Sequence, residues 1–245
     1  MEFRKLRADE IDCRVAQIAS NYCTLLLYKD ARVDQNILDE TVGAMNWQKR
    51  YVRDNANCIV GIWDEDKKQW VEKEDTGTES FSEAEKGLAS DSFKRACFNW
   101  GIGRELYTAP NIMFFPNKDM IPKGQTNEFF EYKDGKYTTK TRFYVDYIDY
   151  EDKTITDLVI RDHKGNIRFE QLTPGTQKEF NKKFEELRKL IEKNEEEDEK
   201  FNREEFYKYF GVDKDNQLNF KQREEAIELL KKRLEKVSKW DQKKR

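Results

Sequence analysis

SEAEKGLASDSFKRACFNWGIG, at residues 82–103, is the clearest helix in the sequence. It opens on a capping box, in which the Ser82 hydroxyl and the Glu85 carboxylate each accept a backbone N–H of the first turn. Apolar side chains then recur at steps of three and four residues, which predicts one buried stripe: Ala84, Leu88, Ala89, Phe93, Ala96, Cys97 and Trp100. Glycines end the helix, and Lys94 and Arg95 fall on its polar side.

Three strands are expected before this helix, at Trp47–Arg53, Asn57–Asp64 and Trp70–Thr76. Each run is rich in aromatic and β-branched residues, and polar turns separate the runs, so they predict an antiparallel meander. Two further strands are expected between Ile11 and Asp30, and a short helix at Ala31–Val42.

After Pro110 the chain begins with a proline-containing loop, Asn111–Asn127. Short strand-like runs follow, and from Pro174 onward the apolar spacing is helical throughout. The expected strands are Phe129–Tyr132, Arg142–Tyr150, Ile155–Ile160 and Asn166–Phe169, with a hairpin turn at Lys164-Gly165. The predicted fold class is α+β: an antiparallel β-meander packed on a long helix, plus a C-terminal helical module.

Four parts are expected along the chain. Residues 1–110 form a core and residues 111–170 a β-rich extension of it. Residues 171–203 form a charged helical linker, because the run Glu192–Lys200 makes a poor core and a good tether. Residues 204–245 form a small helical module that docks a partner.

Composition indicates a soluble, cytoplasmic protein. Of the 245 residues, 37% are hydrophobic and 39% are charged, but 13% are aromatic, which is too many for a disordered chain. No stretch of eighteen apolar residues exists, and Met1–Glu10 is charged where a signal peptide would be apolar.

The residues that carry common catalytic and metal chemistry are sparse. The four cysteines have no Cys-x-x-Cys spacing, and His163 is the single histidine. No phosphate-binding loop of the Walker type appears, and Gly101-Ile102-Gly103 lacks the third glycine of a dinucleotide loop. We therefore expect no cofactor, no metal and no enzymatic activity.

Two acidic patterns offer weak metal-binding alternatives. Glu65-Asp66-Lys67, eleven residues after Asp54, matches the loosest form of a Mg²⁺-dependent nuclease signature, although it falls in a polar turn. Asp213 to Glu224 resembles a calcium loop at its outer ligands, but Leu218 replaces the glycine that the sharp turn needs. Chance matches are expected in a chain this acidic.

Charge is uneven along the chain. Residues 1–110 carry a net charge of −4, residues 111–170 of −1 and residues 171–245 of +2. A nucleic-acid binder of this composition therefore needs a local basic groove. Lys94 and Arg95 could stand on its rim; alternatively, Arg95 pairs with Asp91 one turn earlier and Lys94 is merely solvated.

The residues around the helix carry a resemblance to a known family. Three stretches resemble the signature of the Rad-fifty-two family of single-strand DNA annealing proteins, in the form found in phages and mobile elements. They are Asp75-Thr76-Gly77-Thr78, Ala89-Ser90-Asp91-Ser92-Phe93-Lys94-Arg95-Ala96 and Asn99-Trp100-Gly101. Arg14-Val15-Ala16, Asn36, Gly43 and Asn46-Trp47 match at compatible spacing, so the resemblance covers about residues 5–108.

This resemblance implies an ATP-independent protein that binds single-stranded DNA and anneals complementary strands in homologous recombination and double-strand break repair. Its subunits would form a ring or filament with the DNA in a basic groove. Residues 1–110 would be the annealing core, and the host's single-strand-binding protein would dock on residues 204–245.

The basic residues that carry over as DNA contacts are Arg14, Lys94 and Arg95. Phe98 stands where the family has a further basic residue, and Arg104 is a candidate to supply that charge. Lys49 and Arg53, on the first strand of the meander, complete the candidate set. A module that reads the shape of double-stranded RNA or DNA is the alternative function, because a meander followed by a helix also suits it.

Overall fold

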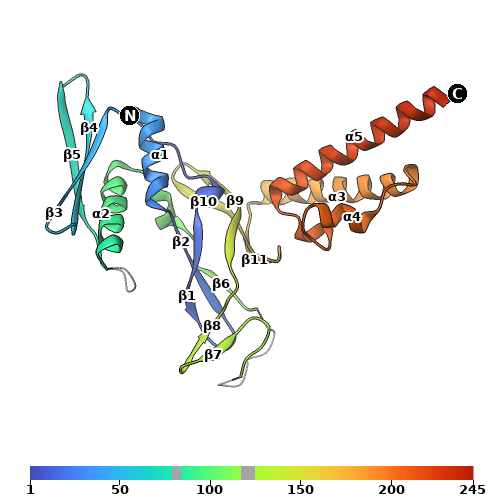
Figure 1. Ribbon diagram of the computed structural model, residues 1–245, viewed down its shortest axis with the longest axis horizontal. Helices are drawn as coiled ribbons and strands as arrows, with labels where there is room; N and C mark the ends of the chain where they lie inside the picture. The colour runs from blue at the N-terminus through green and yellow to red at the C-terminus, as the bar shows by residue number, and fades with distance from the viewer. Residues whose placement is uncertain (79–83, 117–124, 245) are drawn as a thin grey trace. The chain divides into compact units, whose positions relative to one another are not determined.

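A computed structural model describes residues 1–78, 84–116 and 125–244, and the Ser82 half of the predicted capping box lies outside them (Figure 1). The chain is α+β with antiparallel sheets, as predicted. It divides into two compact units. The first comprises Met1–Asp12, Leu27–Pro110 and Glu151–Ile155, and the second comprises Cys13–Leu26, Asn111–Tyr150 and Thr156–Arg245.

The first unit contains the predicted meander and the predicted long helix. Its elements are η1 (Ala8–Glu10), α1 (Ala31–Val42), β3 (Trp47–Val52), β4 (Asn57–Asp64), β5 (Gln69–Thr76), α2 (Ala84–Trp100) and η2 (Arg104–Thr108). The three strands pair in the order β3-β4-β5, each within one residue of its predicted bounds. Helix α2 packs on β4 and β5, and α1 packs on α2.

The core of this unit lies between the meander and α2. Cys58, Val60 and Ile62 alternate along β4, and Phe93 and Cys97 lie on the apolar stripe of α2; all five are buried. The period of two in the strand and the steps of three and four in the helix therefore produce complementary apolar faces.

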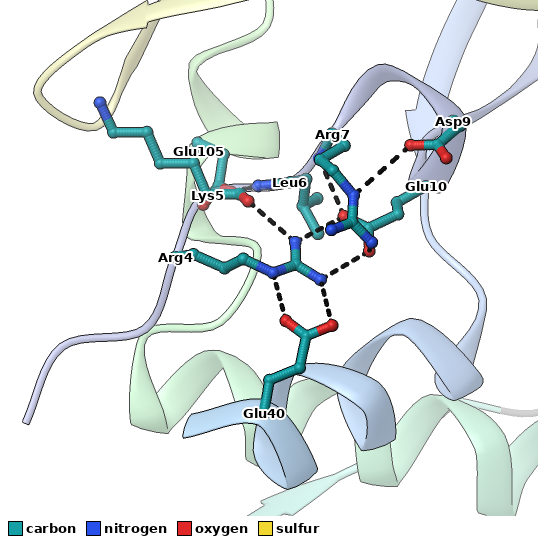
Figure 2. Close-up of polar contacts among 8 residues, drawn as sticks. All are labelled: Arg4, Lys5, Leu6, Arg7, Asp9, Glu10, Glu40 and Glu105. Atoms are coloured by element: carbon teal, nitrogen blue, oxygen red, sulfur yellow. Dashed lines mark hydrogen bonds and ion pairs between the residues drawn. The ribbon is translucent and has the colours of Figure 1, made fainter. Parts of the chain in front are cut away.

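The N-terminal segment is held on this unit by charged hydrogen bonds (Figure 2). The Arg4 guanidinium donates to both oxygens of Glu10 at 2.7 Å and, through Nε, to Glu40 of α1 at 2.6 Å. The backbone N–H of Leu6 donates to the buried Glu105 carboxylate of η2 at 2.7 Å. Burial alone would raise the pKa of Glu10, but the hydrogen bonds from Arg4 and Arg7 lower it overall.

The second unit contains most of a six-stranded sheet, ordered β11-β10-β9-β1-β2-β6, and a separate hairpin. The sheet strands are β1 (Asp12–Ile18), β2 (Cys23–Tyr28), β6 (Ile112–Phe114), β9 (Phe143–Glu151), β10 (Thr154–Asp162) and β11 (Ile167–Gln171). The hairpin is β7 (Glu131–Lys133) with β8 (Lys136–Thr138). Four further helical elements follow: α3 (Pro174–Glu197), α4 (Arg203–Tyr209), η3 (Asp215–Gln217) and α5 (Phe220–Lys244).

Two predictions about this region were wrong. Residues 13–26 do not belong with the rest of 1–110, because β1 and β2 pair into the sheet of the second unit. The expected loop Asn111–Asn127 contains β6, whose Ile112 and Phe114 are buried beside β2. A strand of three residues between two prolines is too short to show a periodic pattern.

The expected linker at residues 171–203 is also corrected. Leu187 and Ile191 of α3 share one buried cluster with the residues that follow: Phe206, Tyr207, Phe210, Leu218, Ala226, Ile227 and Leu230. Helix α3 is amphipathic, so its many charged residues lie outward while a narrow apolar stripe packs. Residues 171–203 and 204–245 therefore form one packed helical layer rather than a tether and a separate module.

A buried ion pair joins this helical layer to the sheet. Arg161 of β10 donates from Nε to Asp146 of β9 at 2.6 Å, and both side chains are almost fully buried. A second guanidinium nitrogen donates to the carbonyl of Asn216 at 2.8 Å, and Asp146 accepts the backbone N–H of Phe220 at 2.8 Å. One pair thus fixes both the turn before α5 and the first residue of α5.

We expect Asp146→Ala to lower the free energy of unfolding by about 3–5 kcal/mol, because it leaves the Arg161 guanidinium buried without its counter-ion. Urea denaturation measures this loss. Asp149→Ala, at an exposed position of the same strand, should change stability by less than about 0.5 kcal/mol. Equal losses of stability in the two variants would contradict the structural role given to the Arg161–Asp146 pair.

Candidate nucleic-acid interface

Gly77 brings the end of β5 against the backbone of α2. Its N–H donates to the carbonyl of Ala56 at 2.8 Å, which continues the pairing of the meander. A Cβ at this position would lie 2.5 Å from the backbone nitrogen of Ser92 and 2.6 Å from the carbonyl oxygen of Leu88. Only a residue without a side chain allows this approach.

Polar residues on both sides of Gly77 hold the strand end to α2. Thr78 donates from its backbone N–H and its hydroxyl to Asp91, at 2.9 and 3.0 Å. Asp75 accepts from Arg95 Nε at 3.3 Å and from Asn99 Nδ2 at 3.2 Å. The alternative pairing of Arg95 with Asp91 is therefore not the one observed. The Arg95 side chain remains 43% exposed.

Lys94 is half-buried beside acidic residues of α1. Asp30 is the N-cap of that helix and accepts the backbone N–H of Arg32. The pKa of Asp30 is lowered mainly by the hydrogen bonds from Arg32, and the charge of Lys94 lowers it further. Asp34 is buried in an ion pair with Lys29. Burial raises the pKa of Asp34 to about 6, against the opposing attraction of Lys29 and Lys94.

The C-terminal end of α2 is occupied by two cations. Arg104 donates to the carbonyl oxygens of Phe98 and Asn99, at 2.5 and 2.8 Å, and Lys73 of β5 donates to Asn99 at 2.7 Å. Positive groups are favourable here because the last carbonyls of a helix are unpaired and carry partial negative charge. Arg104 therefore caps the helix in this structure, which limits its freedom to replace the basic residue missing at Phe98.

The remaining predicted contacts lie in different places. Lys49 of β3 lies over the Phe93 ring of α2, at 4.4 Å from the ring centroid. Arg53 is exposed in the turn between β3 and β4, with a φ of 54°. Arg14 is exposed on β1, in the second unit, whereas the other five candidates belong to the first.

Sequence reasoning missed Lys73, and it included Asp75 only as part of the family signature, not as the partner of Arg95. Val71, Lys73 and Asp75 alternate with more exposed neighbours along β5, so they point to the side of the strand that α2 covers. That alternation, read together with the meander, is the signal that could have identified them.

Some acidic groups of the two weak metal alternatives form ion pairs. Within the exposed turn after β4, Glu65 of the nuclease-like pattern pairs with Lys68, and Lys67 of that pattern pairs with Asp64. In the other pattern, Asp215 pairs with Arg188 and Glu224 with Lys183. Within the described residues no group of three or more acidic, cysteine or histidine side chains is arranged to hold a metal ion.

Comparisons with protein-family models, with curated proteins and with solved structures gave no match for this chain. Among the described residues no helix combines the length and the apolar content that a membrane span requires.

We expect Gly77→Ala to destabilise the protein by about 1–3 kcal/mol, since the added methyl group forces the end of β5 away from α2. Thermal unfolding followed by circular dichroism measures the loss. Gly175→Ala is the matched control: it sits in the first turn of α3 with no atom near its Cβ, so it should be neutral or stabilise by up to about 1 kcal/mol. A Gly77→Ala variant as stable as this control would contradict the close packing described for Gly77.

Proposed function

We propose that the protein binds single-stranded DNA and anneals complementary strands without ATP, as a member of the Rad-fifty-two family of annealing proteins. The observation that carries the proposal is the placement of Lys94 and Arg95. They are consecutive, partly exposed cations on a helix that a three-stranded meander holds through Gly77 and Asp75. A meander of three strands followed by a helix, in the order β3-β4-β5-α2, is the arrangement that membership of this family implies.

The chemistry suits this arrangement. Annealing requires that the repulsion between two polyanions be lowered, and it makes or breaks no covalent bond. Lysine and arginine side chains achieve this by displacing the counter-ions condensed on the phosphates, which explains why such binding weakens as salt rises. Two cations on adjacent residues of a helix contact the backbone and leave the bases available for pairing.

Asp75 sets how readily Arg95 can contact a phosphate. Arg95 reaches this carboxylate through a single hydrogen bond of 3.3 Å and remains partly exposed. Guanidinium groups bind carboxylates and phosphates with the same fork of donors, so a DNA phosphate competes with Asp75 for the same group.

We expect Lys94→Ala and Arg95→Ala each to weaken binding to single-stranded DNA and to reduce the log–log salt slope by about 0.7 for each phosphate that the variant no longer neutralises. Asp75→Asn should act in the opposite direction, because it releases Arg95. Fluorescence anisotropy with a labelled oligonucleotide measures all three variants.

Lys68→Ala, in the exposed turn after β4, is the control for loss of charge in the same unit and should have little effect. If annealing survives the combined loss of Lys94 and Arg95 at moderate salt, the proposal that these two residues contact the DNA is refuted. Equal affinity for single and double strands would favour a shape-reading module instead.

The proposal includes assembly into a ring or filament. The meander presents β3 and β5 as sheet edges, and several large side chains of the first unit are exposed: Met45, Trp70 and Tyr107. Open edges and exposed apolar surface favour association with further copies of the chain. We expect light scattering to detect oligomers at micromolar concentration. A stable monomer that still anneals DNA would refute this part.

Docking of the host's single-strand-binding protein on residues 204–245 remains the last part of the proposal. Of the four aromatic residues between positions 206 and 210, Phe206, Tyr207 and Phe210 are buried in the helical layer, and Tyr209 is exposed. The surface is therefore mainly the charged outer side of α4 and α5.

A further inference from the structure

The end of α5 is the most basic part of the chain. Residues 231–245 contain eight lysine and arginine residues and only two acidic residues, Glu235 and Asp241, which is a net charge of +6. The whole chain carries −3, so the first 230 residues carry −9. This concentration of positive charge differs from the mixed charge pattern of a solvated helix face.

Among the described residues, the ion pairs of α5 with α3 and with the residue directly after α3 extend no further along α5 than Arg233. The two helices run side by side through the pairs Lys183–Glu224, Lys231–Glu186 and Arg233–Asp198. Helix α3 ends at Glu197, whereas α5 continues to Lys244. The eleven residues after Arg233 extend about 16 Å at the rise of an α-helix. Figure 1 shows α5 continuing beyond α3 to the C-terminus.

Lys236 and Lys239 differ from the three cations directly before them on α5, which are Lys231, Lys232 and Arg233. Both are exposed, and neither forms an ion pair with a side chain that the structure describes, whereas Lys231 and Arg233 each have an acidic partner on or directly after α3. Favourable interaction with the helix dipole explains cations only within the last turn. Lys236 and Lys239 both precede that turn.

We propose that Lys236 and Lys239 of α5 form a second contact for the phosphate backbone of single-stranded DNA, separate from Lys94 and Arg95. The inference rests on the proposed function for the identity of the polyanion. Phosphates require only closely spaced exposed cations. Acidic peptide motifs are recognised mainly by clusters of arginine, whereas Lys236 and Lys239 are both lysines.

The test compares Lys236→Gln/Lys239→Gln with Lys182→Gln/Lys189→Gln in the full-length protein. The second pair removes two exposed lysines of α3 and so matches the loss of charge. We expect the α5 variant to bind a labelled oligonucleotide more weakly, with a log–log salt slope reduced by about 1.4, and the α3 variant to bind like the unaltered chain. Circular dichroism should be the same for all three proteins.

Repeating the α5 substitutions in a Lys94→Ala/Arg95→Ala background separates the two proposals. If Lys94 and Arg95 do not contact DNA, the Lys94→Ala/Arg95→Ala variant binds DNA like the unaltered chain. The α5 substitutions still weaken DNA binding when they are added to it. Equal effects of the α5 and α3 variants would overturn the inference. The inference would also be overturned if the α5 variant bound DNA normally but bound poly-glutamate more weakly than the unaltered chain. In that case the end of α5 would be a contact for an acidic protein.

Discussion

The absence of a side chain at Gly77 is the constraint on which the candidate interface depends. It lets the end of β5 lie against the backbone of α2, close enough that a single methyl group would collide with Ser92 and Leu88. Because of that approach, Thr78 reaches Asp91 and Asp75 reaches Arg95. A small displacement of β5 would break both contacts and leave the cations of α2 without a defined position relative to the meander.

The same contacts show that the number of cations in a sequence overstates the number available to a ligand. Arg104 and Lys73 neutralise the C-terminal carbonyls of α2, and Lys29 is buried with Asp34. Arg104 and Lys73 thereby stabilise the end of the helix, and Lys29 supplies the partner without which the buried Asp34 charge would be costly. Lys94 and Arg95 are different because both side chains remain partly exposed although acidic residues lie beside them.

Local patterns predicted most of the first unit. The strands of the meander, α1 and α2 follow from period-two and period-3.6 spacing over six or more residues, and the residues Lys94 and Arg95 follow from their place on α2. The pairing of Arg95 with Asp75 joins residues twenty positions apart, and no local rule contains it. The linker prediction was wrong for a related reason: the composition of α3 is that of a tether, but the stripe of Leu187 and Ile191 packs on a partner far along the chain.

Net charge is a poor guide to what this chain can bind. Charges separated by more than the Debye length, about 8–10 Å at physiological salt, are largely screened, so a phosphate responds to the side chains beside it rather than to the total of −3. Acidic residues distributed over α3 therefore need not prevent binding at the end of α5, where the cations are four or fewer residues apart. What matters is whether each cation has an internal partner and whether further cations lie close to it in the chain. On these grounds Lys236 and Lys239 are better placed to meet a polyanion than Arg104, the candidate to replace the basic residue missing at Phe98.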